Sequence, residues 1–350
     1  MAFAIIIIII VNCSYFLYMY VLRSNAMFKK FACLNYVENR DEIPVRFGLM
    51  KKVPNSFMDW YVEKFNPFVV LDIDIAGLEG YNILMPITKE EALKDPAKNN
   101  KIINQTLRSL KDYNVDIVLP PKNIDIPLKD NIWVANGRNL FPFFMAEAVK
   151  KGLRAVGRDI KKAEVYIINN DLSTTQAVID NLLFDINFLT VVDINGEREL
   201  IREQAEYIFA ESGLNIRIVE EDKQFIKNAD VVINTWANND KYDYAYRKKA
   251  VLFDLCSDSQ RLKSLSEKRG DMLIVDSLQI SVNKVSMPLY MFELAFYVKS
   301  KAYRQMCNDG YNLENAKPAA TELNEMAAKM VGFSIMGNVY SSARLSRFSH

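Results

Sequence analysis

The sequence predicts an α/β protein with two domains, an N-terminal α/β domain followed by a doubly wound parallel sheet. Its 350 residues, half of them apolar, are enough for two domains that each bury a core. Segments rich in branched apolar residues alternate with helix-like segments, as expected for parallel strands joined by right-handed crossovers. Residues 164–197 also follow the strand, turn, helix and strand order of a Rossmann-like nucleotide-binding unit.

Residues 1–26 form an apolar segment with two interpretations. Residues 2–22 carry no charge, are long enough to cross a bilayer and are followed by basic residues, which predicts an anchor with the body facing the cytoplasm. The alternative is that the segment is not native, because "SNAM" at 24–27 resembles a scar left by tag cleavage. We expect the protein proper to begin at Met27, to lie in the cytoplasm, and to meet a membrane only if residues 1–26 are native.

Residues 27–157 are predicted to form the N-terminal α/β domain, of the kind that holds a substrate. Ile103, Leu107 and Leu110 lie on one stripe of an amphipathic helix at 98–114. A second helix at 139–157 leads out of the domain. Apolar runs rich in branched residues predict strands at 68–76, 81–88 and 115–120.

Residues 158–287 are predicted to form the Rossmann-like domain, and residues 288–350 the C-terminal helices. Helical stretches separate most of the apolar runs in the second domain, as a doubly wound sheet requires. After it, a long helix at 288–306 is expected to pack back between the domains, and 321–333 is helix-like. The predicted strands lie near 164–169, 187–193, 215–219, 230–235, 250–255 and 272–275.

Charge and composition exclude several functional classes. Lys plus Arg number 44 against 43 for Asp plus Glu, without a long run of one sign, so nothing favours a nucleic-acid partner. The only histidine is His350, which argues against a catalytic triad, a Cys-His pair and a histidine-ligated metal. The cysteines lack CxxC spacing, so we expect reduced thiols and no metal site: Cys13, Cys33, Cys256 and Cys307.

The turn after the strand at 164–169 lacks the glycines of a dinucleotide site. In "IINNDLSTTQAV" the three glycine positions fall on Asn169, Leu172 and Thr175. Asn169 tolerates a left-handed turn, but Leu172 puts a branched side chain where phosphate oxygens need bare backbone amides.

Polar residues of the same turn can still cap the next helix. Asp171, Ser173 and Thr174 are the candidates, and the Asp171 carboxylate would repel a pyrophosphate. If a cofactor does bind, these three residues and Asn169 are its expected contacts.

Two further strand ends offer cofactor contacts. Asp193 ends the strand at 187–193, where an acid can bind the ribose diol of NAD, or else simply cap the next helix. Asn234 begins the polar loop "NTWANND", which could hold a nucleotide through side-chain hydrogen bonds.

Several segments together resemble one known family. "RFGLMKKVP" (46–54), "EGYNILMPITKEEAL" (79–93) and "KIINQTLRSLKDYNVDIV" (101–118), with the Rossmann-like half, are similar to long-chain acyl-[acyl-carrier-protein] reductases. Close bacterial relatives of that family are amino-acid or shikimate-type dehydrogenases. The resemblance covers residues 31–305 and implies transfer of a fatty acyl group to a cysteine and its reduction to an aldehyde by NADPH. It also implies an acyl carrier protein or acyl-CoA as partner.

The sequence departs from the family at the positions that carry its catalytic residues and its acyl site. If Glu293 is matched to the family's glutamate, Tyr290 stands where the nucleophilic cysteine should be, and a register shift puts Leu294 there. The glycine- and serine-rich segment of the acyl site reads "PKNIDIPLKD" (121–130), and only Gly137 keeps the small residue expected before the connecting helix.

Three residues remain catalytic candidates. Cys256 follows the fifth predicted strand of the second domain and is the best relocated nucleophile, although without a histidine its thiolate needs a lysine or a helix N-terminus. Lys101 matches a basic residue that holds an anion in the family, or is a solvated helix lysine. Tyr290 is either a general acid or a packed aromatic.

Two main functional hypotheses follow. In the first, the chain is a diverged family member, a pseudoenzyme impaired in catalysis that acts as a binding or partner protein and holds no cofactor. In the alternative, it is an active NAD(P)-dependent oxidoreductase that uses NADP or NAD to reduce an acyl thioester or oxidise a small hydroxy or amino acid. A membrane-anchored body is compatible with both, and the sequence leaves open whether a homo-oligomer forms.

Overall fold

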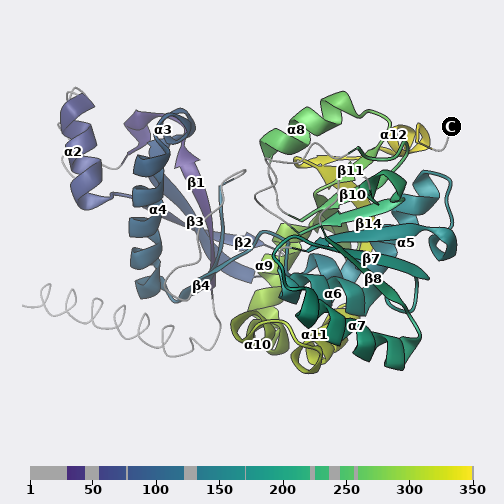
Figure 1. Ribbon diagram of the computed structural model, residues 1–350. Helices are drawn as coiled ribbons and strands as arrows, with labels where there is room; N and C mark the ends of the chain where they lie inside the picture. Colours follow the sequence, from purple (N-terminus) through teal and green to yellow (C-terminus); the bar gives the residue numbers. More distant parts are fainter. Residues whose placement is uncertain are drawn as a thin grey trace, which may run out of the picture. The chain divides into compact units, whose positions relative to one another are not determined.

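Two compact units make up the computed structural model (Figure 1). Unit 1 lies within Met1–Val118 and Ile126–Val134, and unit 2 lies within Leu119–Asp125 and Ala135–His350. The structure describes residues 30–43, 55–75, 78–121, 132–169, 171–220, 225–235, 245–255 and 259–348. The apolar segment predicted at 1–26 lies outside these residues. No helix in the part that is described has the length and apolar character needed to span a bilayer.

Unit 1 is built on a five-stranded mixed sheet of order β2-β3-β1-β4-β5. Strands β1 and β3 pair in parallel, and β2 pairs with β3 in antiparallel fashion. The strands are β1 (Lys30–Val37), β2 (Val69–Ile75), β3 (Leu78–Thr88), β4 (Val115–Leu119) and β5 (Trp133–Val134). Strands β2, β3 and β4 correspond to the three strands predicted here, and β1 and β5 were missed.

Two helices of unit 1, α3 and α4, begin at residues that cap them. Thr88 and Glu91 form a reciprocal capping box at the start of α3, and Asp95 accepts a hydrogen bond from the Lys98 amide at the start of α4. The buried stripe of α4 includes Ile103, Leu107 and Leu110, as predicted. The helices are α2 (Asn55–Phe65), α3 (Lys89–Lys94) and α4 (Pro96–Leu110), with short 3-10 turns η1 (Arg40–Glu42) and η2 (Lys111–Tyr113).

Unit 2 is built on a six-stranded sheet of order β11-β10-β9-β6-β7-β8. Each neighbouring pair is parallel. Read across the sheet from β8 to β11, the strands are the third, second, first, fourth, fifth and sixth of this sheet in sequence, which is the doubly wound order of the Rossmann fold. The strands are β6 (Glu164–Asn169), β7 (Phe188–Asp193), β8 (Ile216–Glu220), β9 (Val231–Asn234), β10 (Val251–Asp254) and β11 (Leu273–Val275). The predicted α/β fold class with a parallel second sheet is confirmed.

Helices connect and cover these strands. Helices α5 and α6 contact each other, and the close approach of Gly152 in α5 to Val251 and Phe253 shows that α5 packs on β10. The helices are α5 (Met145–Ala155), α6 (Leu172–Leu182), α7 (Arg198–Ser212) and α8 (Ser259–Lys268), with 3-10 turns η3 (Phe141–Phe144), η4 (Ile160–Lys162) and η5 (Phe225–Asn228).

A third sheet of four antiparallel strands, in the order β13-β12-β14-β15, was not predicted. Its strands are β12 (Ser277–Val282), β13 (Val285–Pro288), β14 (Lys329–Ile335) and β15 (Asn338–Val339). The helix predicted at 321–333 is therefore wrong in its second half. Helix α11 (Leu313–Glu325) ends there because Ala327 takes a left-handed conformation with φ of +51°, and the chain then enters β14.

The long helix predicted at 288–306 is two helices. Helix α9 (Leu289–Lys299) ends at Ser300, whose backbone is extended and whose hydroxyl accepts a hydrogen bond from the Tyr303 amide. Ser300 therefore serves as the N-cap of α10 (Lys301–Asp309), because its side chain competes with helix continuation. The chain then runs through α11 and the third sheet to α12 (Ser342–Ser346).

Candidate functional site

Polar side chains end four neighbouring strands of the six-stranded sheet. Asn169 pairs with Asp193 in register, and Asn234 pairs with Asp254. All four side chains are buried. The strand order reverses between β6 and β9, and ligands of doubly wound sheets bind outside the carboxyl ends of the strands at such a reversal. This edge of the sheet is therefore the candidate functional site.

Asn169 connects the end of β6 to the two helices that follow. Its side-chain oxygen accepts a hydrogen bond from the Thr175 hydroxyl at 2.7 Å, and its amide nitrogen donates to the Glu197 carboxylate at 3.1 Å. Asn169 and Thr175, two of the three residues at glycine positions, thus contact each other. The Glu197 carboxylate lies beside the end of β6, close to where a pyrophosphate would bind.

Asp171 is the N-cap of α6. Its carboxylate accepts hydrogen bonds from the backbone amides of Ser173 at 3.2 Å and Thr174 at 3.1 Å, and from the Thr174 hydroxyl. Amides at a helix N-terminus are the groups that normally hold a phosphate. Asp171 therefore occupies two of these donors with a negative charge, and Ser173 and Thr174 contribute backbone amides to the cap.

Asp193 binds backbone in the loop before α7. One of its carboxylate oxygens accepts hydrogen bonds from the amides of Gly196 and Glu197, each at 3.1 Å. Gly196 has a φ of +76°, which lets the chain turn back tightly toward Asp193. The Asp193 carboxylate thus holds the loop before α7, whose N-cap residue Glu197 makes no side-chain capping hydrogen bond, and its contact with a ribose stays a prediction.

A second polar cluster lies at the ends of β9 and β10. The Asn234 side-chain amide donates a hydrogen bond of 3.2 Å to an oxygen of Asp254, and the Arg261 guanidinium of α8 forms an ion pair with the same oxygen. Asp254 is fully buried. Asn234 was predicted from the sequence and Asp254 was not, although Asp254 is an acid at a strand end, as Asp193 is.

The carboxylates outnumber the cations among the residues described at this edge. The set includes five carboxylates and two arginines: Asp171, Asp193, Glu197, Glu220 and Asp254 against Arg198 and Arg261. Charges in such a crevice act on a ligand with little screening when they are partly buried. The edge therefore disfavours a pyrophosphate and favours neutral or hydrogen-bonding parts of a ligand.

Glu293 forms a separate buried centre in the same unit. One oxygen accepts a hydrogen bond of 2.6 Å from the Gly137 amide, and the other accepts one of 2.7 Å from the Tyr303 hydroxyl. Burial raises the pKa of Glu293 to about 7. Gly137 and Glu293 are the two residues that the family resemblance retained, and they are in direct contact.

Gly137 has a backbone that favours glycine. Its φ is +84°, and a Cβ atom there would lie 3.5 Å from the Leu289 side chain and 3.6 Å from the Tyr290 amide nitrogen. The loop that carries Gly137 therefore lies against the first turn of α9, where Tyr290 is found.

The three catalytic candidates have different surroundings. Tyr290 is half-buried on α9, and burial raises its pKa, which keeps the phenol protonated near neutral pH. Lys101 is exposed on α4 in unit 1 and forms an ion pair of 2.5 Å with Glu63, so its surroundings are those of a solvated helix lysine. Cys256 lies outside the described residues. The candidate roles of all three stay predictions.

Two other cysteines are described, and both are buried and free. Burial raises the pKa of the Cys33 thiol to about 11 and raises that of Cys307 further. Both thiols are therefore protonated at neutral pH and are poor nucleophiles. Within the described ranges, no group of three or more His, Cys, Asp or Glu side chains is arranged to hold a metal ion.

Comparisons with known proteins give weak structural similarities. Shikimate 5-dehydrogenase from Listeria monocytogenes, in complex with shikimate and NAD, is 11% identical with a TM-score of 0.32, over 77% of this chain and 90% of that one. L-tryptophan dehydrogenase from Nostoc punctiforme is 12% identical with a TM-score of 0.36, over 85% and 80%. A shikimate dehydrogenase in complex with NADP+ is 13% identical with a TM-score of 0.32, over 85% and 96%.

No family model matches the sequence, and no related sequence was found among curated proteins. The chain thus resembles shikimate and amino-acid dehydrogenase structures at low identity, at TM-scores too low to assign an activity. Nothing in the comparisons supports the acyl-carrier-protein reductase part of the resemblance.

Proposed function

We propose that the chain is an NAD(P)-dependent oxidoreductase that binds its dinucleotide at the carboxyl edge of the six-stranded sheet. One observation carries the proposal: the strand order reverses between β6 and β9, and buried polar side chains end the strands on both sides of that reversal. Apolar strand ends would leave the ribose and amide groups of a dinucleotide without hydrogen-bond partners. The polar side chains at this edge can provide such partners.

The proposal requires an altered phosphate contact. A pyrophosphate takes its usual place at the start of α6 only if the Asp171 carboxylate releases the amides of Ser173 and Thr174. Since an N-cap of this kind is worth about 1 kcal/mol, the displacement weakens binding roughly fivefold, before any repulsion between the charges is counted. We therefore expect a dinucleotide to bind more weakly here than at a glycine-rich turn.

The substrate classes proposed are a small hydroxy or amino acid, or an acyl thioester delivered by CoA or an acyl carrier. A protonated tyrosine can donate a proton to a developing alkoxide, and Tyr290 is assigned that role in the proposal. The acyl-thioester variant needs a thiolate nucleophile, for which Cys256 is the candidate.

A second candidate is a binding or partner protein that has lost redox catalysis. The specific observation in its favour is that the carboxylates of Asp171 and Glu197 lie where a dinucleotide places its pyrophosphate. This candidate predicts that the full chain binds no dinucleotide, whereas the oxidoreductase proposal predicts binding.

The deciding experiment is a calorimetric titration of the full chain with NADPH, NADP, NADH and NAD. Micromolar binding of any of them supports the oxidoreductase, and no heat up to millimolar cofactor, from protein shown to be folded, overturns it in favour of the binding protein. If a cofactor binds, turnover is then measured with acyl-CoA and with hydroxy and amino acids. The variant Cys256→Ser abolishes only a thioester reaction, so it separates the two substrate classes.

A further inference from the structure

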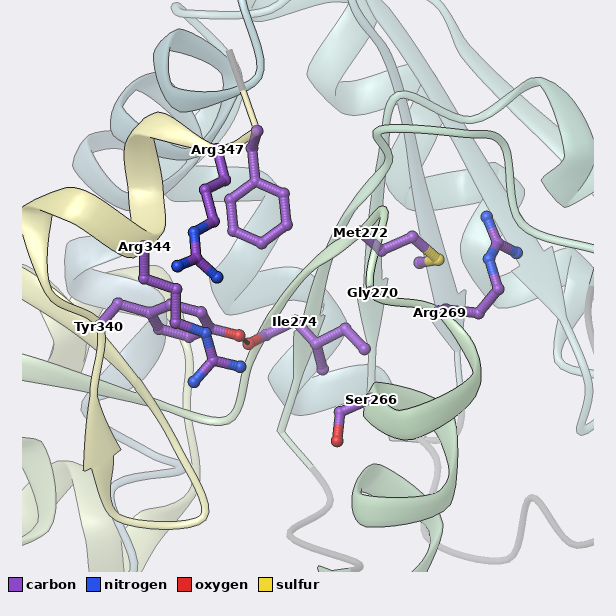
Figure 2. Close-up of a pocket in the computed structure, with 9 residues that line it drawn as sticks. Ser266, Arg269, Gly270, Met272, Ile274, Tyr340, Arg344 and Arg347 are labelled. Atoms are coloured by element: carbon purple, nitrogen blue, oxygen red, sulfur yellow. Dashed lines mark hydrogen bonds between the residues drawn. The ribbon is translucent and has the colours of Figure 1, made fainter. Parts of the chain in front are cut away.

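A cavity of about 220 Å³ lies in unit 2 (Figure 2). It is bounded by the turn from α8 into β11 and by the segment that carries α12. Met272 and Ile274, which line it, lie at the amino end of β11. Because β11 is parallel to the other strands of its sheet, the cavity is at the opposite edge from the polar strand ends described above.

The lining of the cavity carries positive charge only. Three arginines line it and no Asp or Glu does. Arg269 is neutralised by Asp271, with two nitrogen–oxygen distances of 2.8 and 3.0 Å, and its side chain points away from the other two arginines (Figure 2). Arg344 and Arg347 have no carboxylate within 4.0 Å among the residues that the structure describes. Their charges are therefore available to an anion.

The Arg344 guanidinium is positioned before any ligand arrives. It lies over the ring of Tyr340, 4.4 Å from the centroid. The Tyr340 hydroxyl in turn donates a hydrogen bond of 2.7 Å to the carbonyl of Ile274, which fixes the ring against β11. Arg347 follows three residues after Arg344, on the same side of α12 (Figure 2). Preorganised guanidinium groups lose less entropy when they bind an anion.

The rest of the lining is mixed. Ser266, Gly270 and Tyr340 line the cavity together with three buried apolar residues, Met272, Ile274 and Phe348. A volume of about 220 Å³ is smaller than that of a pocket for a drug-sized ligand, so the ligand must be small. Two guanidinium groups match the charge of a phosphate dianion, and their forked donors match its oxygens. The apolar walls match a small organic group attached to the phosphate.

We propose that this cavity binds a small phosphate monoester, with Arg344 and Arg347 holding the phosphate and the apolar walls contacting the ester group. The site is independent of the dinucleotide proposed above, since it lies at the other edge of the sheet. The competing explanation is that the two arginines only complement the carbonyl ends of a short C-terminal helix.

Calorimetric titrations of the full chain at constant ionic strength test the proposal, with inorganic phosphate, phenyl phosphate and phenol as probes. We expect phenyl phosphate to bind more tightly than inorganic phosphate, because its ring contacts the apolar walls, and phenol not to bind. The variants R344Q and R347Q are each expected to weaken phenyl phosphate binding by about tenfold or more, the loss typical of a charge-assisted hydrogen bond. R344K, which keeps the charge but not the fork, is expected to fall between.

The matched control is K317Q, which removes one exposed positive charge from α11. It is expected to bind phenyl phosphate as the unmodified chain does. Thermal unfolding of each variant confirms that it is folded, and α12 is short enough that R344Q and R347Q should keep the midpoint. The proposal is overturned if the unmodified chain binds neither phosphate at millimolar concentration, or if K317Q weakens binding as much as R344Q does. It is also overturned if both arginine variants bind like the unmodified chain.

Discussion

The Tyr303 hydroxyl donates a hydrogen bond of 2.7 Å to Glu293, and both side chains are fully buried. The other oxygen of Glu293 accepts from the Gly137 amide, so one carboxyl group connects α9, α10 and the loop before η3. Burial raises the pKa of Glu293 from its ordinary value of 4.5 to about 7. Between pH 4.5 and about 7, the Glu293 carboxyl is therefore protonated in the folded protein, whereas it is ionised in the unfolded chain.

This proton makes stability depend on pH. Because the folded state binds more protons than the unfolded state between pH 4.5 and about 7, the free energy of unfolding falls as the pH rises through that window. A pKa shift of this size corresponds to roughly 3 kcal/mol of unfolding free energy. This contribution is fully present below pH 4.5 and is lost above about pH 7. The measurement is urea unfolding of the unmodified chain and of E293Q from pH 4.5 to 8. Since glutamine does not titrate, the unfolding free energy of the unmodified chain is expected to fall relative to that of E293Q as the pH rises, and a difference that does not change with pH would contradict the role assigned to Glu293.

Replacing Asp171, the N-cap of α6, is expected to change both the stability of the protein and its affinity for a dinucleotide. Asp171→Ala removes the acceptor for the amides of Ser173 and Thr174, so we expect a loss of about 1 kcal/mol in unfolding free energy. Asp171→Asn keeps the cap and removes only the charge, so its stability should stay close to that of the unmodified chain. Both variants are expected to bind NADPH or pyrophosphate more tightly, as measured by calorimetry. Equal affinity in all three proteins would mean that the carboxylate is not the barrier.

Asp230 is a buried acid held by two arginines. Its carboxylate pairs with Arg158 and Arg247 and accepts a hydrogen bond of 3.0 Å from the Glu164 amide, with only 8% of the side chain exposed. Asp230→Ala removes the acceptor of the Glu164 amide and the partner of two partly exposed arginines, and we expect a loss of about 1–3 kcal/mol. The exposed pair of Glu199 and Arg202 offers the control, because Glu199→Ala should change the urea midpoint little. A small effect of Asp230→Ala would show that the arginines find other partners.

Gly80 leaves room for an aromatic ring in unit 1. It is in register with Phe31 across β1 and β3, and a Cβ atom at Gly80 would lie 2.5 Å from the Phe31 ring. Gly80→Ala is therefore expected to cost about 1–3 kcal/mol through overpacking. Gly270→Ala is the control, since no atom lies within 4 Å of the added carbon. In thermal unfolding, a second change of Phe31→Leu should recover part of the loss in G80A, and a purely additive loss would contradict the steric explanation.

The sequence predicted the six strands of unit 2 because each is a nearly continuous apolar run bounded by polar turns. The β12–β13 hairpin escaped prediction. Its turn is made by Asn283 and Lys284, with φ of +50° and +69°, and contains no glycine to mark it. In the sequence, the break between α9 and α10 is marked only by Ser300. Serine is a common N-cap residue, but it lies here within an otherwise helical pattern.

The candidate site was predictable residue by residue but not as a set of contacts. Asn169, Asp193 and Asn234 follow apolar runs, so their position at strand ends could be inferred. Their partners could not, because Glu197 comes from the loop before α7 and Arg261 from α8, and only the folded topology brings them to the ends of β6 and β10. The Gly137 and Glu293 contact joins residues 156 positions apart and was suggested only as two separate points of resemblance.

The third sheet can form only late in synthesis of the chain, because it pairs β12 with a strand near the C-terminus. Strand β12 hydrogen-bonds β14, and Ser334 reaches the Ser277 carbonyl across 57 positions of sequence. As the chain leaves the ribosome, the six parallel strands are complete before β14 exists, so β12 emerges with one edge open. An open strand edge can pair with a second nascent chain. A chain that ends before residue 329 would therefore complete the six-stranded sheet but leave one edge of β12 unpaired and open to other strands.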